Sequence, residues 1–277
     1  MTLKSVLVLG SSGQIGSSLV SFLEDSGLVV GTFDIAEDAV EDLRLISNND
    51  LVETIRKFDF TVFLAFDVGG SKYLEEHQNS SSFIINNLLI MSNTFDALSK
   101  ARKPFIFASS QMSAIPDSSY GILKAIGERA TAALKGVTLR FWNVYGLEEN
   151  TDKAHVISDF IRSASSFGEI RMRTSGIEKR DFLHVDDACS AILTIAQKLS
   201  RGEVSGSLDV AAFKYHSISD VASIVASIVP AKIFAGDKED GVQNGHTAHP
   251  STDILQFWKP RFELREGIQD IVSRMKS

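Results

Sequence analysis

The sequence predicts an α/β fold, a doubly wound parallel sheet followed by a smaller C-terminal lobe. Short apolar runs alternate with helical patterns along the first half of the chain, which is typical of parallel sheets covered by helices on both faces. A glycine-rich turn directly follows the first apolar run and opens a helical pattern. With 277 residues, 44% of them hydrophobic, the chain can bury a sizeable core as one large domain or two lobes.

Composition excludes several function classes. The chain has 28 Lys and Arg against 35 Asp and Glu, a net charge of -7, which argues against nucleic acid as a partner. No apolar stretch reaches the length of a membrane span and no signal peptide is recognisable, so we expect no membrane partner and a cytoplasmic protein. The single cysteine, Cys189, excludes an intramolecular disulfide and a multi-cysteine metal site. We expect it to be a small core residue.

The first apolar run, residues 4–9, leads into Gly10-Ser-Ser-Gly13-Gln-Ile-Gly16 and then into a helical pattern. This is the strand, turn and helix context of a dinucleotide phosphate site. Glycines allow the backbone to turn tightly and approach a pyrophosphate, whose charge then lies at the helix N-terminus.

Residues 28–33 form the second predicted strand, which ends at Asp34. A carboxylate at this point can accept hydrogen bonds from both adenosine ribose hydroxyls and repels a 2′-phosphate, so it favours NAD over NADP. The alternative is an ordinary solvated turn aspartate. The sequence further predicts a helix at 50–57, a strand at 59–65, a helix at 79–100, a strand at 104–108 and a strand at 137–141.

Tyr120 and Lys124 carry the strongest chemical signal between these last two strands. On a helix they lie one turn apart on the same face. Making half of a phenol ionised near neutrality requires roughly 4 kcal/mol, and an ammonium about 4 Å away supplies roughly that much at an effective dielectric of about 20. The pair therefore suits an acid/base, and the alternative is a surface helix that carries both residues by chance.

The strand–helix rhythm loosens after residue 146, and a polar stretch at 148–152 lacks hydrophobic periodicity. We therefore expect a dinucleotide-binding domain at 1–150. We expect residues 151–277 to form mainly a substrate-binding lobe, with some segments returning to the first domain.

Taken in order, the motifs of the chain resemble one family. They are the glycine turn, Asp34, Asp42-Leu43, Phe63-Leu64-Ala65, Asn87, Ser109-Ser110, Tyr120 and Lys124 with Glu128, LRFWNVYG at 139–146, RDFLHVDD at 180–187, and Trp258 and Pro260 before Leu264-Arg-Glu-Gly267. The sequence resembles the extended short-chain dehydrogenase/reductase superfamily, in its NAD-dependent epimerase/dehydratase branch acting on nucleotide sugars. The resemblance covers nearly the whole chain and implies a Rossmann domain.

The resemblance assigns roles to single residues. Tyr120 would be the acid/base, Lys124 would lower its pKa and bind the nicotinamide ribose, and Ser110 would bond the reacting oxygen. The implied NAD contacts are Gly10, Gly13, Gln14, Ile15, Gly16, Asp34, Ile35, Asp42, Leu43, Leu64, Ala65, Phe66, Asn87, Tyr120, Lys124, Trp142 and Val144. The implied substrate contacts are Ser110, Gln111, Asn143, Arg173 and Arg180, and basic residues at 171, 173 and 179 suit a phosphate.

Some of these residues have plainer interpretations. Arg180 and Asp181 are also explained as a structural ion pair. His184 lies in a strand pattern and is expected to be a packing residue. His155, His246 and His249 have no spacing typical of a metal site, and we expect no metal.

Four departures from the family pattern limit the interpretation. Ser110 and Tyr120 are only ten residues apart, so the loop that covers the substrate in the family is cut short. Gln111-Met112 stands where the dehydratases have Asp-Glu, which disfavours dehydration. The family's Arg-x-Gly-Asp phosphate clamp is replaced by residues 237–242, with Lys238 as the only nearby cation, and Asp209-Val-Ala-Ala lacks the family's strand-end glycine.

Three functions fit the sequence. The first is an NAD-dependent nucleotide-sugar epimerase, the second a keto-sugar reductase or dehydrogenase with net hydride transfer, and the third a non-catalytic NAD-sensing protein. The family also implies a homodimer formed by the helices at 79–100 and 118–134, where Phe83, Leu88, Phe95 and Ile122 are apolar.

Overall fold

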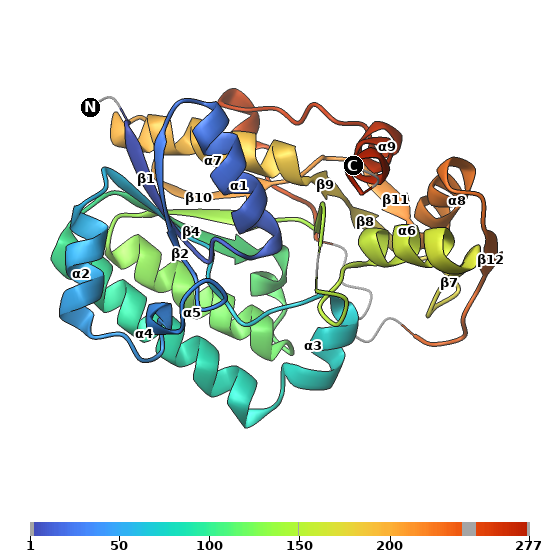
Figure 1. Cartoon of the computed structure of the whole chain (residues 1–277), viewed down its shortest axis with the longest axis horizontal. Coiled ribbons are helices and arrows are strands. Elements are labelled where there is room, and N and C mark those ends of the chain that lie inside the picture. Colours follow the sequence, from blue (N-terminus) through green and yellow to red (C-terminus); the bar gives the residue numbers. More distant parts are fainter. Residues whose placement is uncertain (1–2, 149, 240–247, 276–277) are drawn as a thin grey trace.

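A six-stranded parallel sheet lies at the centre of the larger part of the molecule, and a second group of helices and short strands lies at one end (Figure 1). The computed structural model describes residues 3–148, 150–239 and 248–275. The strands are β1 (Ser5–Leu9), β2 (Val29–Phe33), β3 (Phe60–Phe63), β4 (Phe105–Ser110), β5 (Val137–Phe141) and β10 (Gly206–Val210). Their order is β10-β5-β4-β3-β1-β2, and every neighbouring pair is parallel. The predicted fold class is confirmed.

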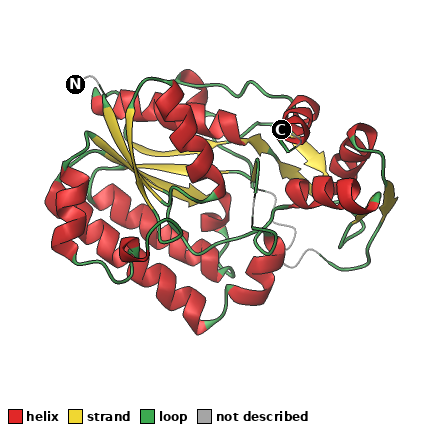
Figure 2. Cartoon of the chain, in the orientation of Figure 1, coloured by secondary structure: helices red, strands yellow, loops and turns green. Residues whose placement is uncertain are grey.

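Helices cover both faces of this sheet (Figure 2). On one face lie α1 (Gln14–Asp25) and α7 (Val185–Ser200), and on the other α2 (Asn48–Arg56), α4 (Ser81–Ala101) and α5 (Ser119–Ala133). Alternate side chains of β1 serve the two layers, because Val6 and Val8 pack toward α1 and α7, whereas Leu7 and Leu9 pack toward α2, α4 and α5. A strand buried on both faces needs a continuous apolar run, as β1 has.

The order of the strands reverses between β1 and β3, which places a crevice at the carboxyl ends of these strands. Dinucleotide-binding sheets commonly have three strands on one side of this point and three on the other, in the order 3-2-1-4-5-6. Here β2 is the edge strand, since residues 34–47 form turns and a short 3-10 helix, η1 (Ala39–Glu41). The crevice is where such sheets bind their ligands.

Several predicted boundaries differ from the structure; the helix expected at 79–100, for example, spans 81–101. The strand expected at 59–65 ends at Phe63, because the N–H groups of Leu64 and Ala65 both turn to the carbonyl oxygen of Leu9, at 2.9 and 2.8 Å. A short helix, α3 (Ser71–His77), precedes α4 and has no clear periodicity in the sequence.

The second group of elements has its own apolar core. It contains α6 (Val156–Phe167), α8 (Ile218–Ile228) and α9 (Leu264–Arg274), with three two-stranded sheets, and η3 (Asp253–Gln256) precedes α9. The sheets pair β7 (Glu169–Arg171) with β12 (Lys232–Phe234), β8 (Lys179–Asp181) with β11 (Tyr215–Ser217), and β6 (Val144–Tyr145) with β9 (Leu183–His184). Between them in sequence, α7 and β10 belong to the central sheet layers. Within the described ranges, no helix combines the length and apolar character needed to cross a membrane.

Candidate active site

The glycine turn connects β1 to α1 with its backbone drawn tightly together. Gly10 has φ +92°, and a Cβ on Gly16 would lie 2.0 Å from the carbonyl oxygen of Gly10. Gly13 is the N-cap residue of α1 and provides no side-chain hydrogen bond to the helix. The N–H groups of the first turn are thus left for an anion, so this part of the chain fits the pyrophosphate of a dinucleotide. Gln14 is directed differently, since its Nε2 donates to the carbonyl oxygen of Val144 at 3.3 Å.

Asp34 follows β2 directly and faces the glycine turn. Its Oδ2 accepts the N–H of Ser12 at 3.0 Å, and its Oδ1 accepts the N–H of Ala36 at 2.9 Å. The next residue, Ile35, exposes 49% of its surface, which leaves an apolar side chain available to a flat ring. Asp34 thus lies where a residue that binds the adenosine ribose is expected.

Asp42 and Leu43, predicted to contact adenine, lie below the surface at 5% exposure each. The guanidinium of Arg44 binds the Asp42 carboxylate through Nε at 2.8 Å and Nη2 at 2.7 Å. These hydrogen bonds hold the pKa of Asp42 below its ordinary value against the effect of burial. Leu43 packs in the core, so its side chain serves the fold.

Asn87 holds the loop after β3 in place. Its Oδ1 accepts the N–H of Asp67 at 2.7 Å, while its Nδ2 donates to the carbonyl oxygens of Asp67 at 3.1 Å and Phe83 at 3.0 Å. The side chain is fully buried and its amide is used by these bonds. Asn87 therefore fixes the backbone at Asp67, and its contact with NAD stays a prediction.

Ser110, Tyr120 and Lys124 come together where β4 and α5 meet. Ser110 is the last residue of β4, and η2 (Gln111–Ala114) follows it at once. Ser118 caps α5 by accepting the N–H of Gly121 at 3.0 Å, which sets Tyr120 and Lys124 in the first two turns on one helix face. The hydroxyl of Tyr120 is hydrogen-bonded to the side chain of Ser110.

Burial opposes ionisation of both groups on α5. It raises the pKa of Tyr120 to about 12, against the hydrogen bond from Ser110. It lowers the pKa of Lys124 to about 7, against the attraction of Glu128. Desolvation and the Ser110 hydrogen bond set the pKa of Tyr120 in the ligand-free protein, and the lowering of that pKa by Lys124 stays a prediction.

Glu128 fixes the helix to the strands that carry the site. Its Oε1 accepts the hydroxyl of Ser109 at 2.6 Å and Nε of Arg140 at 2.9 Å, and its Oε2 accepts Nη2 of Arg140 at 2.6 Å. Ser109 lies on β4 and Arg140 on β5, so one carboxylate joins α5, β4 and β5 beside the predicted catalytic residues. Glu128 is thus a structural member of the motif.

The residues after β5 face the second group of elements. Trp142 is 4% exposed, and its Nε1 has no hydrogen-bond partner among the described residues. Asn143 has φ +23° and donates its Nδ2 to the carbonyl oxygen of Asp181 at 2.9 Å. The Asp181 carboxylate accepts the N–H groups of Ala212 at 2.7 Å and Lys214 at 3.0 Å, so it organises a backbone turn.

Arg173, one of the predicted phosphate ligands, forms an ion pair with Glu75 of α3. The carbonyl oxygen of Arg173 accepts the N–H of Lys238 at 3.1 Å. Lys238, which belongs to the segment that replaces the family's phosphate clamp, therefore lies beside Arg173. Arg180 donates Nη1 to the carbonyl oxygen of Lys179 at 2.8 Å. Residues 240–242 of the clamp segment, and His246, lie outside the described residues.

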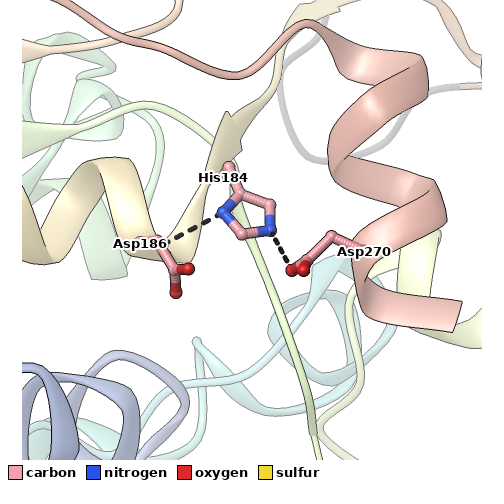
Figure 3. A group of neighbouring side chains, drawn as sticks. All are labelled: His184, Asp186 and Asp270. Carbon is pink, nitrogen blue, oxygen red and sulfur yellow. Dashed lines mark hydrogen bonds and ion pairs between the residues drawn. The ribbon is translucent and has the colours of Figure 1, made fainter. Parts of the chain in front are cut away.

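His184 lies in a network of charged side chains between α7 and α9 (Figure 3). Its ring stacks on Phe262 with centroids 4.0 Å apart, Nδ1 accepts the N–H of Asp186 at 3.2 Å, and Nε2 lies 3.2 Å from Oδ2 of Asp270. Arg274 binds Asp186 through Nη1 at 3.0 Å and Asp270 through Nε at 2.8 Å. Since the guanidinium bridges both carboxylates, the cluster is suited to holding α9 in place. The packing role predicted for His184 is confirmed.

The other predicted minor residues have local roles. Cys189 is fully buried and free, as expected. His155 Nδ1 lies 2.6 Å from Oε1 of Glu148. His249 contacts the ring of Tyr215 at 5.4 Å between centroids.

Two contacts of the site have little signal in the sequence. Oε1 of Gln78 accepts the hydroxyl of Ser118 at 2.9 Å and the N–H of Tyr120 at 3.4 Å, which ties the end of α3 to the start of α5. Glu37 contacts the glycine turn through Ser11 and Ser12. Neither Gln78 nor Glu37 was recognisable from the sequence as a partner of these residues.

Residues 6–211 match the NAD dependent epimerase/dehydratase family. The chain belongs to this family. The recognised superfamily is thus confirmed, the protein is an enzyme of the extended short-chain dehydrogenase/reductase type, and NAD is the cofactor of the family.

The relatives include proteins acting on different nucleotide sugars. A probable GDP-L-fucose synthase 1 of Oryza sativa subsp. japonica is 26% identical over 95% of this chain and 89% of its own length. Epimerase Mth375 of Methanothermobacter thermautotrophicus has the same fold, with a TM-score of 0.85 and 19% identity over 99% of this chain and 93% of that one. The UDP-glucose 4-epimerase of Thermus thermophilus, solved with NAD, gives a TM-score of 0.79 and 20% identity over 99% of both chains.

Proposed function

We propose that this enzyme is an NAD-dependent epimerase of a nucleotide sugar. The observation that carries the proposal is the meeting of Ser110, Tyr120 and Lys124 at the carboxyl end of β4. In the order of the sheet, β4 is the second strand from β1, so the three residues lie on the same edge as the glycine turn. Residues 151–277 would supply most of the substrate-binding lobe.

Each of the three side chains has a distinct part. The Tyr120 phenolate takes the proton of a sugar hydroxyl and the resulting phenol returns it, while the Ser110 hydroxyl holds the reacting oxygen in line with Tyr120. Lys124 provides the positive charge that favours the phenolate and hydrogen bonds for the nicotinamide ribose. When bound, NAD supplies the acceptor and donor of hydride at the sugar carbon. Return of the hydride to the opposite face of the keto-sugar would invert the centre.

A nucleotide diphosphate fits the basic residues of the lobe. Arg173 follows β7 and Arg180 lies in β8, and Asn143 is linked to β8 because its Nδ2 donates to the carbonyl oxygen of Asp181. Guanidinium groups bind phosphate through two parallel hydrogen bonds, as bidentate pairs. Because Arg173 is paired with Glu75, a phosphate would have to replace that carboxylate.

The names of the relatives and the departures of this sequence from the family pattern reduce the number of reactions that fit the site. Proteins of the family with related folds or sequences carry the names GDP-L-fucose synthase, UDP-glucuronic acid decarboxylase and UDP-glucose 4-epimerase, which supports a nucleotide sugar and leaves the nucleotide to experiment. Gln111 follows Ser110 directly and has no ionisable proton for removing water. Dehydration is therefore the least suited of the family's reactions.

The decisive experiment incubates the protein with NAD and a panel of UDP-, GDP-, dTDP- and CDP-sugars. Chromatography follows the sugars, and absorbance follows the reduced nicotinamide. We expect a stereochemical change in one sugar without net accumulation of NADH, and NAD that stays with the protein through purification. Stoichiometric oxidation or reduction of added cofactor would replace the epimerase with the keto-sugar reductase or dehydrogenase. Tight NAD binding with no change in any sugar would favour the NAD-sensing protein.

A further inference from the structure

A second carboxylate besides Asp34 contacts the glycine turn. Oε1 of Glu37 accepts the hydroxyl of Ser11 at 2.8 Å and the hydroxyl of Ser12 at 2.9 Å. Oδ2 of Asp34 accepts the N–H of the same Ser12 at 3.0 Å. Two acidic side chains thus approach one residue of the turn, one through its backbone and one through its side chain.

The turn after β2 holds these carboxylates in place. The N–H of Glu37 donates to the carbonyl oxygen of Asp34 at 3.0 Å, and the N–H of Asp34 donates to Oε2 of Glu41 at 2.7 Å. Ser11 is 3% exposed, and its Oγ also accepts the N–H of Phe33 at 3.1 Å. Glu37 is therefore tied to β2 through Ser11 and to its own turn through the backbone.

This turn concentrates negative charge. Hydrogen bonds, first that from Ser11, hold the pKa of Glu37 below its ordinary value, so the side chain is charged. Burial and then the repulsion of Glu37, Asp38 and Asp34 raise the pKa of Glu41. These negative charges repel an anion that approaches Asp34.

We propose that Glu37 is a second specificity-determining residue of the cofactor site, which together with Asp34 excludes the 2′-phosphate of NADP. The inference rests on the NAD-dependent function proposed above. The ribose hydroxyls of NAD are neutral donors that two carboxylates accept, whereas a phosphate monoester carries about -1.5 to -2 charges near neutrality. Glu37 and Asp34 both contact Ser12. The charge of Glu37 would therefore repel a phosphate on the 2′-oxygen of a ribose that Asp34 binds.

Isothermal titration of NAD and NADP into purified protein tests the assignment. In Glu37→Gln the side-chain oxygen can still accept from both Ser11 and Ser12, so these two hydrogen bonds are kept while the charge is lost. Asp38→Asn is the matched control, because Asp38 is the neighbouring exposed acid and bonds only the N–H of Val40 within its own turn, at 3.0 Å. Both variants lose one negative charge within the same segment.

We expect Glu37→Gln to bind NADP at least about tenfold more tightly than the wild type, with NAD affinity changed by less than about threefold. Asp38→Asn should change either affinity by less than about twofold. Asp34→Asn combined with Glu37→Gln should bind NADP more tightly than either single variant.

Three results would overturn the inference. An unchanged NADP constant in Glu37→Gln limits Glu37 to organising the turn, and so does equal weakening of NAD and NADP. An equal gain in Asp38→Asn shows a diffuse effect of net charge. A wild-type protein that binds neither cofactor contradicts the proposed function itself, whereas NAD binding with no effect of Glu37→Gln contradicts this inference alone.

Discussion

The ammonium of Lys124 lies 3.8 Å from the centre of the Phe66 ring. Its Nζ donates to the carbonyl oxygen of Ala108 at 2.7 Å, and the rings of Phe107 and Tyr120 lie 5.0 and 5.8 Å away. The lysine is only 3% exposed, so aromatic faces and one carbonyl replace its hydration. Such contacts stabilise a cation by about 0.5–2 kcal/mol, less than the cost of removing it from water.

Replacing Lys124 with Met should stabilise the protein in a pH-dependent manner. Burial lowers the pKa of Lys124 from 10.5 to about 7, so the unfolded chain binds more protons than the folded one between these values, and wild-type stability rises with pH there. Below pH 7 the folded protein bears the full cost of the buried charge. The advantage of Lys124→Met should thus be largest at about pH 6 and roughly 2–3 kcal/mol smaller at about pH 9.

Urea unfolding of both proteins at the two pH values measures this difference. Lys72→Met serves as the control, because Lys72 is an exposed residue of α3. Its effect should be the same at both pH values. If the advantage of Lys124→Met does not vary with pH, Lys124 has an ordinary pKa in the folded protein.

Replacing Tyr120 with Phe should remove catalysis while leaving the fold intact. The hydroxyl is the exchangeable group, whereas the ring packs edge-on against Phe66 with centroids 5.7 Å apart, and phenylalanine keeps that contact. We expect turnover of the sugar identified in the panel to fall at least about 10²-fold, the usual scale of general acid/base catalysis. NAD affinity, measured by titration, should be unchanged. Persisting turnover would mean that another group exchanges the proton.

Two tryptophans form a matched pair for testing an unpaired donor. Nε1 of Trp142 has no partner among the described residues, whereas Nε1 of Trp258 donates to Oγ of Ser190 at 2.8 Å. Both side chains are buried, at 4% and 8% exposure. Trp258→Phe should therefore destabilise the free protein by about 1 kcal/mol more than Trp142→Phe, because only Trp258→Phe breaks a hydrogen bond.

The family resemblance implies that Trp142 lies at the nicotinamide. In that case ligand affinity should depend more on Trp142 than on Trp258, the opposite of the order expected for stability. An N–H left free in the fold is available to the cofactor or sugar. Trp142→Phe should then weaken ligand affinity by roughly fivefold, while Trp258→Phe leaves it unchanged. Equal losses of stability in the two variants would show that Trp142 has a hydrogen-bond partner in the free protein.

What the sequence predicted well depends on local spacing or on strand ends. The glycine turn and Asp34 end β1 and β2, and Ser110 ends β4. The carboxyl ends of parallel strands lie at one edge of the sheet. The inferred parallel sheet therefore predicted that these residues lie close together. The helical spacing of Tyr120 and Lys124 likewise placed both on one face.

The contacts that could not be predicted join residues far apart in sequence. Glu75 and Arg173 are 98 residues apart, and Gln78 and Ser118 are 40 apart. Nothing in either segment specifies its partner, because the packing of α3 against the rest brings them together. The raised pKa of Tyr120 has the same origin, since desolvation depends on the whole surrounding structure.

The last prediction concerns α4 and α5, which the family resemblance assigns to a dimer interface. Among the residues named from the sequence, Phe83 is 2% exposed and Phe95 packs on the Phe63 ring at 5.4 Å, so both belong to the core. Leu88 and Ile122 are 42% and 47% exposed. Their exposed apolar neighbours on the same helices are Ile85, Leu89 and Ile126.

These five side chains recur at intervals of one helical turn, so they form stripes that a second copy of the chain can cover. Light scattering at micromolar concentration should therefore give the mass of a dimer, about twice 30.3 kDa. Leu88→Glu combined with Ile126→Glu buries two unpaired charges in such an interface and should give a monomer. Ile177→Glu is the control, because Ile177 is 80% exposed between β7 and β8 and outside the stripes. A wild-type monomer, or dissociation caused equally by Ile177→Glu, would contradict the assignment of the interface to α4 and α5.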